Sequence, residues 1–215
     1  MAKVVRSSIV DENLYSNKHS TYIVHFGTAA IRTTVTSLSG VVTSWIFGIS
    51  DSTSGFGRLL VGLHIEWRPN ESQYFNPAAT LQICVDDRCL IFQLVHADLV
   101  PPVLKYFMAS SHCLFVGVDI ESDLEKLRSD HNFDFFPNCK DLRSLAAERY
   151  GVEDLRRSDL KRLVHDVLNV DIEKPANVET SRWDLECLSR AQIKHAAIDA
   201  YACFEIGRAL RATHT

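Results

Sequence analysis

Hydrophobic and polar positions alternate along much of the first half of the chain, which is the spacing of half-buried strands. The segments with this β-like character cover residues 21–26, 31–36, 59–67, 80–85, 88–94 and 113–118. Asp86 and Asp87 separate two of these segments and predict a hairpin. We expect five or six strands in one sheet.

Helix-like segments dominate the second half. They cover residues 41–47, 101 or 102 to 109, 122–130, 142–150, 158–168 and 190–211. Strands that come first, then strand–helix alternation, then helices, indicate an α/β or α+β fold with a mixed central sheet flanked by helices. Residues 169–182 are the most loop-like segment, and we expect them to form part of a substrate cleft.

The composition is that of a soluble globular protein. Its 215 residues fit one domain, and 46% of them are hydrophobic and 23% charged. We expect an N-terminal extension over residues 1–20 and the domain over residues 21–212. Neither a membrane-spanning run nor the apolar core of a signal peptide is found in the sequence. The sequence therefore predicts an intracellular protein, cytoplasmic, nuclear or both, without a membrane partner.

Charge and cysteine usage narrow the possible roles. A net charge of −4 argues against a protein that coats nucleic acid through bulk electrostatics. The basic residues Arg156, Arg157, Lys161 and Arg162 either line a local cleft or form a solvated helix face. Six scattered cysteines without a CxxC pair favour buried, reduced thiols over disulfides or a zinc site.

Charged residues interrupt apolar surroundings at three places. In the first, strand alternation puts His64 and Glu66 on one face, while Leu63, Ile65 and Trp67 point to the other. The apolar face must pack on a core. This leaves an imidazole and a carboxylate side by side, either on an ordinary wet face or in a site.

Capping-box patterns mark two helix starts near the other charged residues. Ser122 with Glu125 is one, and Ser189 with Gln192 is the other. The first box would put Asp123 in the first turn of a helix, just beyond a strand end. A carboxylate there either interacts with the helix dipole or lies where α/β folds bind ligands.

The last predicted helix carries the third charged place. His195 and Asp199 are one turn apart, and they share their stripe with Ala202 and Ile206. This stripe is too apolar for ordinary surface, so Asp199 needs a cationic partner. The partner is either His195 alone or a metal ion.

Together the three places resemble the motifs of the DEDD (DnaQ-like) 3′–5′ exonuclease superfamily, in the same order and at normal separations. The first motif, Asp-x-Glu on a strand, corresponds to His64-Ile65-Glu66. VGVDIESDLEKL resembles the second motif in its Werner-type form, with Asp123 as its aspartate. The third, Tyr-x-x-x-Asp in the tyrosine branch, corresponds to His195 and Asp199. The resemblance covers about residues 22–210 and implies a ribonuclease H-like fold.

The resemblance also implies a mechanism with two divalent ions, Mg²⁺ or Mn²⁺, that clamp the attacking and leaving oxygens of a phosphodiester. We expect His64 and Glu66 to lie on the central strand and to face the helix of His195 and Asp199. The expected catalytic residues are Glu66, Asp123, His195 and Asp199; the metal ligands are His64, Glu66, Asp123 and Asp199; Trp67 and Arg68 contact nucleic acid.

Within the superfamily, the chain is most similar to small plant exonucleases, including the RISC-interacting clearing exoribonucleases. Glu-Trp-Arg-Pro-Asn at residues 66–70, followed by ATLQIC, carries this likeness. The likeness implies a homo-oligomer, a hexamer, that degrades single-stranded RNA and associates with Argonaute.

Two residues depart from the family pattern. His64 replaces an aspartate that contacts both ions, and a neutral imidazole offers one free nitrogen and suits Mg²⁺ poorly. Asp119 or Glu121 could supply the missing carboxylate. His195 replaces a tyrosine, and a histidine can take the proton of the attacking water directly.

Two classes of function therefore stay open. One is a working exonuclease with an unusual metal site, which acts on RNA or, like the Werner-type enzymes, on DNA. The other is a catalytically reduced relative that serves as an RNA-binding or assembly subunit. Stepwise shortening of a strand that a chelator abolishes would distinguish them.

Overall fold

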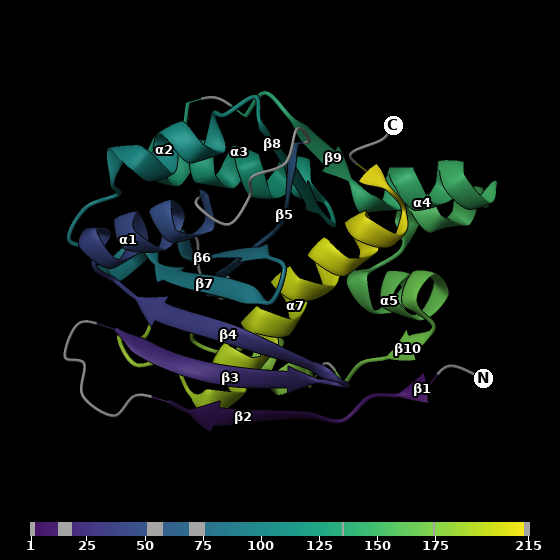
Figure 1. Ribbon diagram of the computed structural model, residues 1–215, viewed down its shortest axis with the longest axis horizontal. Coiled ribbons are helices and arrows are strands. Elements are labelled where there is room, and N and C mark those ends of the chain that lie inside the picture. Colours follow the sequence, from purple (N-terminus) through teal and green to yellow (C-terminus); the bar gives the residue numbers. More distant parts are fainter. Residues whose placement is uncertain are drawn as a thin grey trace.

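A mixed sheet with helices on both faces forms the body of the protein (Figure 1). The computed structural model describes residues 3–12, 19–50, 58–68, 76–134, 136–173 and 175–212. The strands are β1 (Lys3–Val4), β2 (Ser7–Asp11), β3 (Ser20–Phe26), β4 (Ala29–Thr36), β5 (Leu59–Trp67), β6 (Ala78–Val85), β7 (Arg88–Gln93), β8 (Cys113–Gly117), β9 (Cys139–Asp141) and β10 (Val170–Asp171). The α-helices are α1 (Ser39–Ser50), α2 (Pro102–Met108), α3 (Ile120–His131), α4 (Leu142–Tyr150), α5 (Leu160–Leu168), α6 (Ala176–Glu179) and α7 (Arg190–Ala209), and short 3-10 turns are η1 (Leu94–His96) and η2 (Glu153–Arg157).

The main sheet has eight strands in the order β2-β3-β4-β7-β6-β5-β8-β9. The pairs β4–β7, β5–β8 and β8–β9 are parallel, and the other neighbours are antiparallel. The predicted mixed sheet is confirmed, but the prediction of five or six strands is wrong. Because β4 pairs with β7, the hairpin of β3 and β4 is added to the sheet, and residues 7–11 extend it further as β2. Those residues had been assigned to the N-terminal extension.

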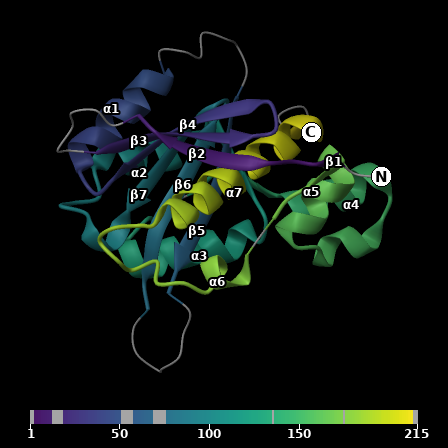
Figure 2. The same cartoon turned by 90° about the horizontal axis from the view of Figure 1, so that it is seen from below.

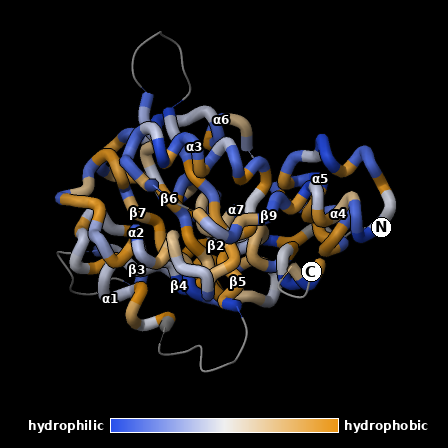
Figure 3. Tube along the Cα trace, turned by 90° about the horizontal axis from the view of Figure 1, so that it is seen from above, coloured by the Kyte–Doolittle hydropathy of each residue, from blue (hydrophilic) through white to orange (hydrophobic). Residues whose placement is uncertain are grey.

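Each face of the sheet packs against its own set of helices. Helices α1, α2 and α3 cover one face, where Leu63 and Ile65 of β5 lie in an apolar core with the side chains of these helices. Helices α4, α5 and α7 cover the other face. Figure 3 shows hydrophobic residues concentrated along the central strands. The alternation of β5 therefore separates one purely apolar side from a second side that faces α7.

Helix α7 crosses the sheet at close range, which Figure 2 shows from below. Gly62 of β5 makes this approach possible, because a Cβ atom there would lie 2.2 Å from the carbonyl oxygen of Ala200. Small residues of α7, among them Ala196 and Ala200, are completely buried at this crossing. The close packing brings the polar side of β5 directly under the helix.

The two predicted capping boxes have different outcomes. The box of Ser189 and Gln192 at the start of α7 is confirmed, with both reciprocal hydrogen bonds present. The prediction of a capping box at Ser122 is wrong, because α3 already begins at Ile120 after an N-cap at Asp119. Asp119 adopts a left-handed conformation with φ of 57°, so the chain turns earlier than predicted. Asp123 nevertheless lies in the first turn, as predicted.

Other sequence predictions can be compared with the fold directly. The predicted loop over residues 169–182 also contains β10 and the short helix α6. All six cysteines are free thiols, and four are buried, in agreement with the prediction. Arg156 and Arg162 of the basic cluster form ion pairs with nearby acidic residues, which supports the solvated surface over a basic cleft. Within the described ranges, no helix combines the length and apolar character needed to cross a membrane.

Candidate metal centre

Three elements bring five polar side chains to one place on the α7 side of the sheet. Strand β5 contributes His64 and Glu66, which alternate with the apolar residues of its other face. The first turn of α3 contributes Asp123, and α7 contributes His195 and Asp199 from successive turns. All five residues had been predicted to share a site, and the structure brings them together.

His64 lies at the middle of this group. Its Nε2 atom is 3.5 Å from Glu66 Oε1 and 3.7 Å from Asp199 Oδ2, and its Nδ1 atom is 3.7 Å from Asp123 Oδ2. His195 Nε2 is 3.5 Å from Glu66 Oε1 and 3.4 Å from Asp199 Oδ2. The sequence left open whether Asp199 has a histidine partner or a shared site. The structure shows the His195 contact as one part of a larger cluster.

Burial makes this cluster unlike a surface ion-pair network. Asp199 is 1% exposed, Asp123 and His195 are 5% exposed, and Glu66 is 9% exposed. The His64 side chain is more accessible, at 22%. Three carboxylates this close together and this far from water repel one another and need compensating positive charge.

The electrostatic environment shifts the proton equilibria of three of these groups. Burial opposes charge on His64, but its hydrogen bond with Glu66 and the three carboxylate charges raise its pKa to about 9. Burial would raise the pKa of Glu66, but the neighbouring imidazoles of His195 and His64 lower it to about 2. Burial raises the pKa of Asp123 to about 7, although His64 opposes this shift. Without a metal, a protonated His64 therefore supplies the compensating charge.

The donor atoms also fit a divalent cation. Ligand atoms of His64, Glu66 and Asp199 all lie within 4.8 Å of one another. Within the part of the chain that the structure describes, the buried atoms His64 Nδ1, Asp123 Oδ2 and His195 Nε2 make no hydrogen bond. Buried polar atoms are normally satisfied, and clusters of unsatisfied ones indicate a missing ion or water. Carboxylate oxygens suit Mg²⁺ and Mn²⁺, whereas an imidazole nitrogen departs from the octahedron of oxygen ligands that Mg²⁺ prefers.

Asp119 and Glu121 do not replace the missing carboxylate. The Asp119 side chain is 61% exposed and accepts a 2.7 Å hydrogen bond from Arg143 on α4. Glu121 is exposed on α3. Neither residue belongs to the group of ligand atoms around His64. The pairing of Asp119 with Arg143 and the exposure of Glu121 therefore argue against the possibility that one of them compensates for His64.

Trp67 and Arg68 follow the site at the end of β5, where sequence analysis placed nucleic-acid contacts. Trp67 is 36% exposed, and Lys126 Nζ lies 5.2 Å from the centre of its ring. Arg68 is half exposed, and its guanidinium is 3.9 Å from Asp184. Pro69 and Asn70 of the same motif lie outside the described residues. The contacts of Trp67 and Arg68 with nucleic acid stay a prediction.

Sequence analysis missed three residues that support the site. Trp183 is completely buried, and its ring lies 6.0 Å from that of His195. On β6, Gln82 pairs in register with His64 and donates a 2.6 Å hydrogen bond to Thr80. The sequence contained a signal for Thr80 and Gln82, because these polar residues alternate with the apolar Leu81 and Ile83 on a predicted strand. For Trp183 the sequence contained no such signal, because it is a lone aromatic residue just beyond a loop-like segment.

Sequence comparisons connect the chain to known nucleases. The profile of a family described as 3′-5′ exonuclease matches residues 49–213. A 3′-5′ exonuclease of Arabidopsis thaliana is 31% identical over 158 residues, which are 72% of this chain and 54% of that protein. A 3′-5′ exonuclease of Drosophila melanogaster is 31% identical over 134 residues, which are 58% of this chain and 36% of that protein. The chain thus spans about half the length, or less, of these relatives.

Solved structures show the same fold. The Nibbler EXO domain of Aedes aegypti superposes with a TM-score of 0.67 at 18% identity, over 83% of this chain and 87% of that chain. RNase D of Escherichia coli, described as an exoribonuclease involved in structured RNA processing, has a TM-score of 0.69 at 13% identity, over 83% of this chain and 44% of that one. The predicted ribonuclease H-like, DnaQ-like fold is confirmed.

Proposed function

Since the chain belongs to the 3′–5′ exonuclease family, we propose that it is a metal-dependent exonuclease that removes nucleotides from the 3′ end of a single strand. One observation carries this proposal. Three buried carboxylates and two histidines meet between β5, α3 and α7, with atoms left unsatisfied toward one another. Such an arrangement costs folding free energy, and a bound cation offsets that cost.

Each residue has a role in the proposed reaction. Glu66, Asp123 and Asp199 would hold two divalent cations, with His64 as a further ligand. When bound, the cations supply positive charge to the phosphodiester and lower the pKa of the attacking water. His195 Nε2 faces the carboxylates and takes the proton of that water as a general base. Trp67 and Arg68, beside the site, contact the strand.

The finer proposals are RNA as the substrate, a homohexameric assembly and association with Argonaute, in the cytoplasm, the nucleus or both. The RNA substrate, the hexamer and Argonaute rest on the resemblance to small plant exonucleases over residues 66–70 and the β6 sequence ATLQIC. The Arabidopsis relative agrees with a plant-like group, and RNase D is described as acting on RNA. Size-exclusion chromatography with light scattering tests the assembly, since only a hexamer gives six times the chain mass of 24.3 kDa.

The activity is tested with single strands labelled at either end. A 5′-labelled RNA should give a ladder that shortens stepwise, whereas a 3′-labelled RNA should release the labelled mononucleotide at once. A chelator should abolish both results. DNA of the same sequence, run in parallel, decides the sugar preference. Release of internal fragments, or shortening that persists in chelator, would contradict the proposal.

The metal dependence gives a second measurement of the same site. We expect faster initial rates in saturating Mn²⁺ than in saturating Mg²⁺, by about tenfold, because Mg²⁺ demands an octahedron of oxygen ligands. Equal or faster turnover in Mg²⁺ would mean that His64 does not bind the metal.

A second candidate function is that of a catalytically reduced RNA-binding or assembly subunit. The position of His64 favours it, because the ring lies within 3.7 Å of all three carboxylates, where a cation would otherwise sit. A metal must then displace a positive charge that the protein itself provides. Strand binding without shortening, at any concentration of Mn²⁺, would support this candidate over the first.

A further inference from the structure

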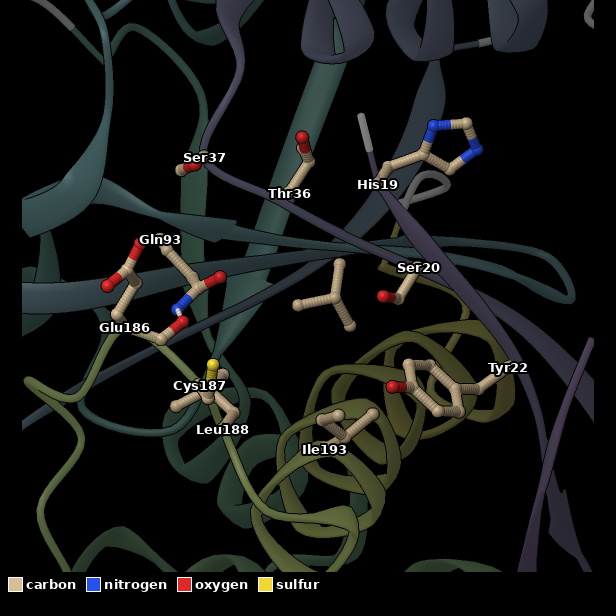
Figure 4. A pocket seen from close by; sticks show the side chains of 11 residues that line it. His19, Ser20, Tyr22, Thr36, Ser37, Gln93, Glu186, Cys187, Leu188 and Ile193 are labelled. Carbon is tan, nitrogen blue, oxygen red and sulfur yellow. Dashed lines mark hydrogen bonds between the residues drawn. The ribbon is translucent and has the colours of Figure 1, made fainter. Parts of the chain in front are cut away.

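A pocket of about 290 Å³ lies on the α7 face of the sheet, and none of its lining residues belongs to the acidic cluster. Figure 4 shows this pocket from close by. Strands β3 and β4 form one wall, and the end of β7 with residues 186–188, which lead into α7, form the other. Val35 and Ile193 provide apolar lining. The proposed nuclease reaction uses none of these residues.

Gln93 gives the pocket a fixed hydrogen-bond acceptor. Its Nε2 atom donates to the carbonyl oxygens of Leu185 at 3.3 Å and Glu186 at 2.8 Å, so the amide cannot turn over without losing both bonds. The residue is 7% exposed, and its Oε1 atom points into the pocket (Figure 4). No residue in the described part of the chain donates to this oxygen. A ligand that fills the pocket and excludes water from this oxygen needs an N–H or O–H donor to pair with it.

The remaining walls define the rest of the ligand. The hydroxyl groups of Tyr22 and Ser20 point into the pocket, and the Tyr22 ring adds an aromatic surface (Figure 4). Among the described residues, neither lysine nor arginine lines it, and its ionisable lining residues include His19 and Glu186. A phosphate would be disfavoured. A flat, uncharged heterocycle with N–H donors and ring acceptors fits the polar edge and the apolar lining.

We propose that this pocket binds a nucleobase, with an N–H of the base directed at Gln93 Oε1. The base comes either from a strand that is being degraded or from a free nucleoside. Gln93 pairs in register with Thr80, and Thr80 with Glu66, so Gln93 lies two strand spacings, about 10 Å, from the acidic cluster. A strand that ends at the cluster can reach this far. The inference rests on the proposed function only for the choice of nucleic acid as the ligand's source.

The side-chain amide of Gln93 is the reporter for the test. We would record its ¹H–¹⁵N signal in chelator, where no strand is cut, and identify the signal by its loss in Gln93→Glu. Adenosine, cytidine and a short single-stranded RNA should shift it, whereas ribose 5-phosphate and inorganic phosphate should not. Tyr22→Leu should weaken binding about tenfold, because base–aromatic stacking is lost. Tyr106→Leu is the matched control, since Tyr106 lies on α2 and is 75% exposed.

Each outcome decides the proposal. A shift with free nucleosides supports a nucleoside site, and a shift with RNA alone supports a site for a base of the bound strand. No shift with either, or an equal shift with ribose 5-phosphate, overturns it. Ser20→Ala gives a second variant if Tyr22→Leu does not fold. A chain that shortens RNA without any Gln93 shift would refute only the pocket, and one that binds bases without shortening RNA would refute only the nuclease.

Discussion

The two faces of strand β5 bury side chains of opposite character. Toward α1, α2 and α3 it presents Leu63 and Ile65, which are at most 1% exposed in an apolar core. Toward α7 it presents Glu66, which is 9% exposed, and the half-buried His64, both surrounded by charge. Burial on the first face stabilises the fold, whereas burial on the second destabilises it unless a cation is present. One side of the strand thus serves stability and the other serves chemistry.

The largest expected effect is on the charged side. Asp199→Asn should lower the rate of strand shortening by about a thousandfold or more, since a ligand charge worth several kcal/mol in the transition state is lost. The measurement is single-turnover degradation of labelled RNA. Asp154→Asn, at an exposed carboxylate of η2, is the matched control and should leave the rate unchanged. An active Asp199→Asn protein would place the chemistry elsewhere.

On the apolar side, Leu63→Ala should cost about 2–5 kcal/mol of unfolding free energy, because it leaves a cavity in a packed core. Urea unfolding measures this cost, and the rate per folded molecule should stay near that of the unmodified protein. Leu99→Ala is the control, because Leu99 is 52% exposed. If Leu63→Ala lowered the rate and left stability intact, the division between the two faces would not hold.

His64→Asp should raise the rate by about a hundredfold, because it restores a bridging carboxylate worth several kcal/mol. The position of Asp119, paired with Arg143, strengthens this expectation, since no other carboxylate replaces the missing one. The comparison needs saturating metal, single-turnover conditions and equal oligomeric state. A folded variant that is no faster would mean that the site depends on the imidazole.

The smallest effect is on the stability of the metal-free protein at different pH. The pKa of His64 rises from 6.5 to about 9 on folding. Protonation of His64 therefore contributes fully to the unfolding free energy below pH 6.5, and this contribution is lost as pH rises toward 9. The pKa of Asp123 rises from 3.8 to about 7 on folding, so most of its contribution to the unfolding free energy is lost below pH 7. Between pH 7 and 9.5, Tm in chelator should therefore fall by on the order of 5 °C. His64→Gln should flatten this part of the profile, and an unchanged slope would exclude His64 as its source.

Much of the site could be predicted from local sequence. Strand alternation placed His64 and Glu66 on one face, and helical spacing placed His195 and Asp199 on one stripe, because both periods are properties of the backbone. The resemblance of the three motifs then joined these pieces with Asp123. The strand count could not be predicted in this way, because the pairing of β4 with β7 joins distant segments whose alternation does not specify a partner.

The tertiary structure alone decided that Asp119 lies outside the cluster. The turn at Asp119 starts α3 two residues before Ser122 and directs the Asp119 carboxylate to Arg143, a residue far along the chain. Trp183 reaches His195 only because the segment before α7 folds back over the sheet. The sequence by itself determined which residue types alternate on β5 and α7. Their distances, their burial and the central place of His64 depend on long-range packing, which local periodicity does not encode.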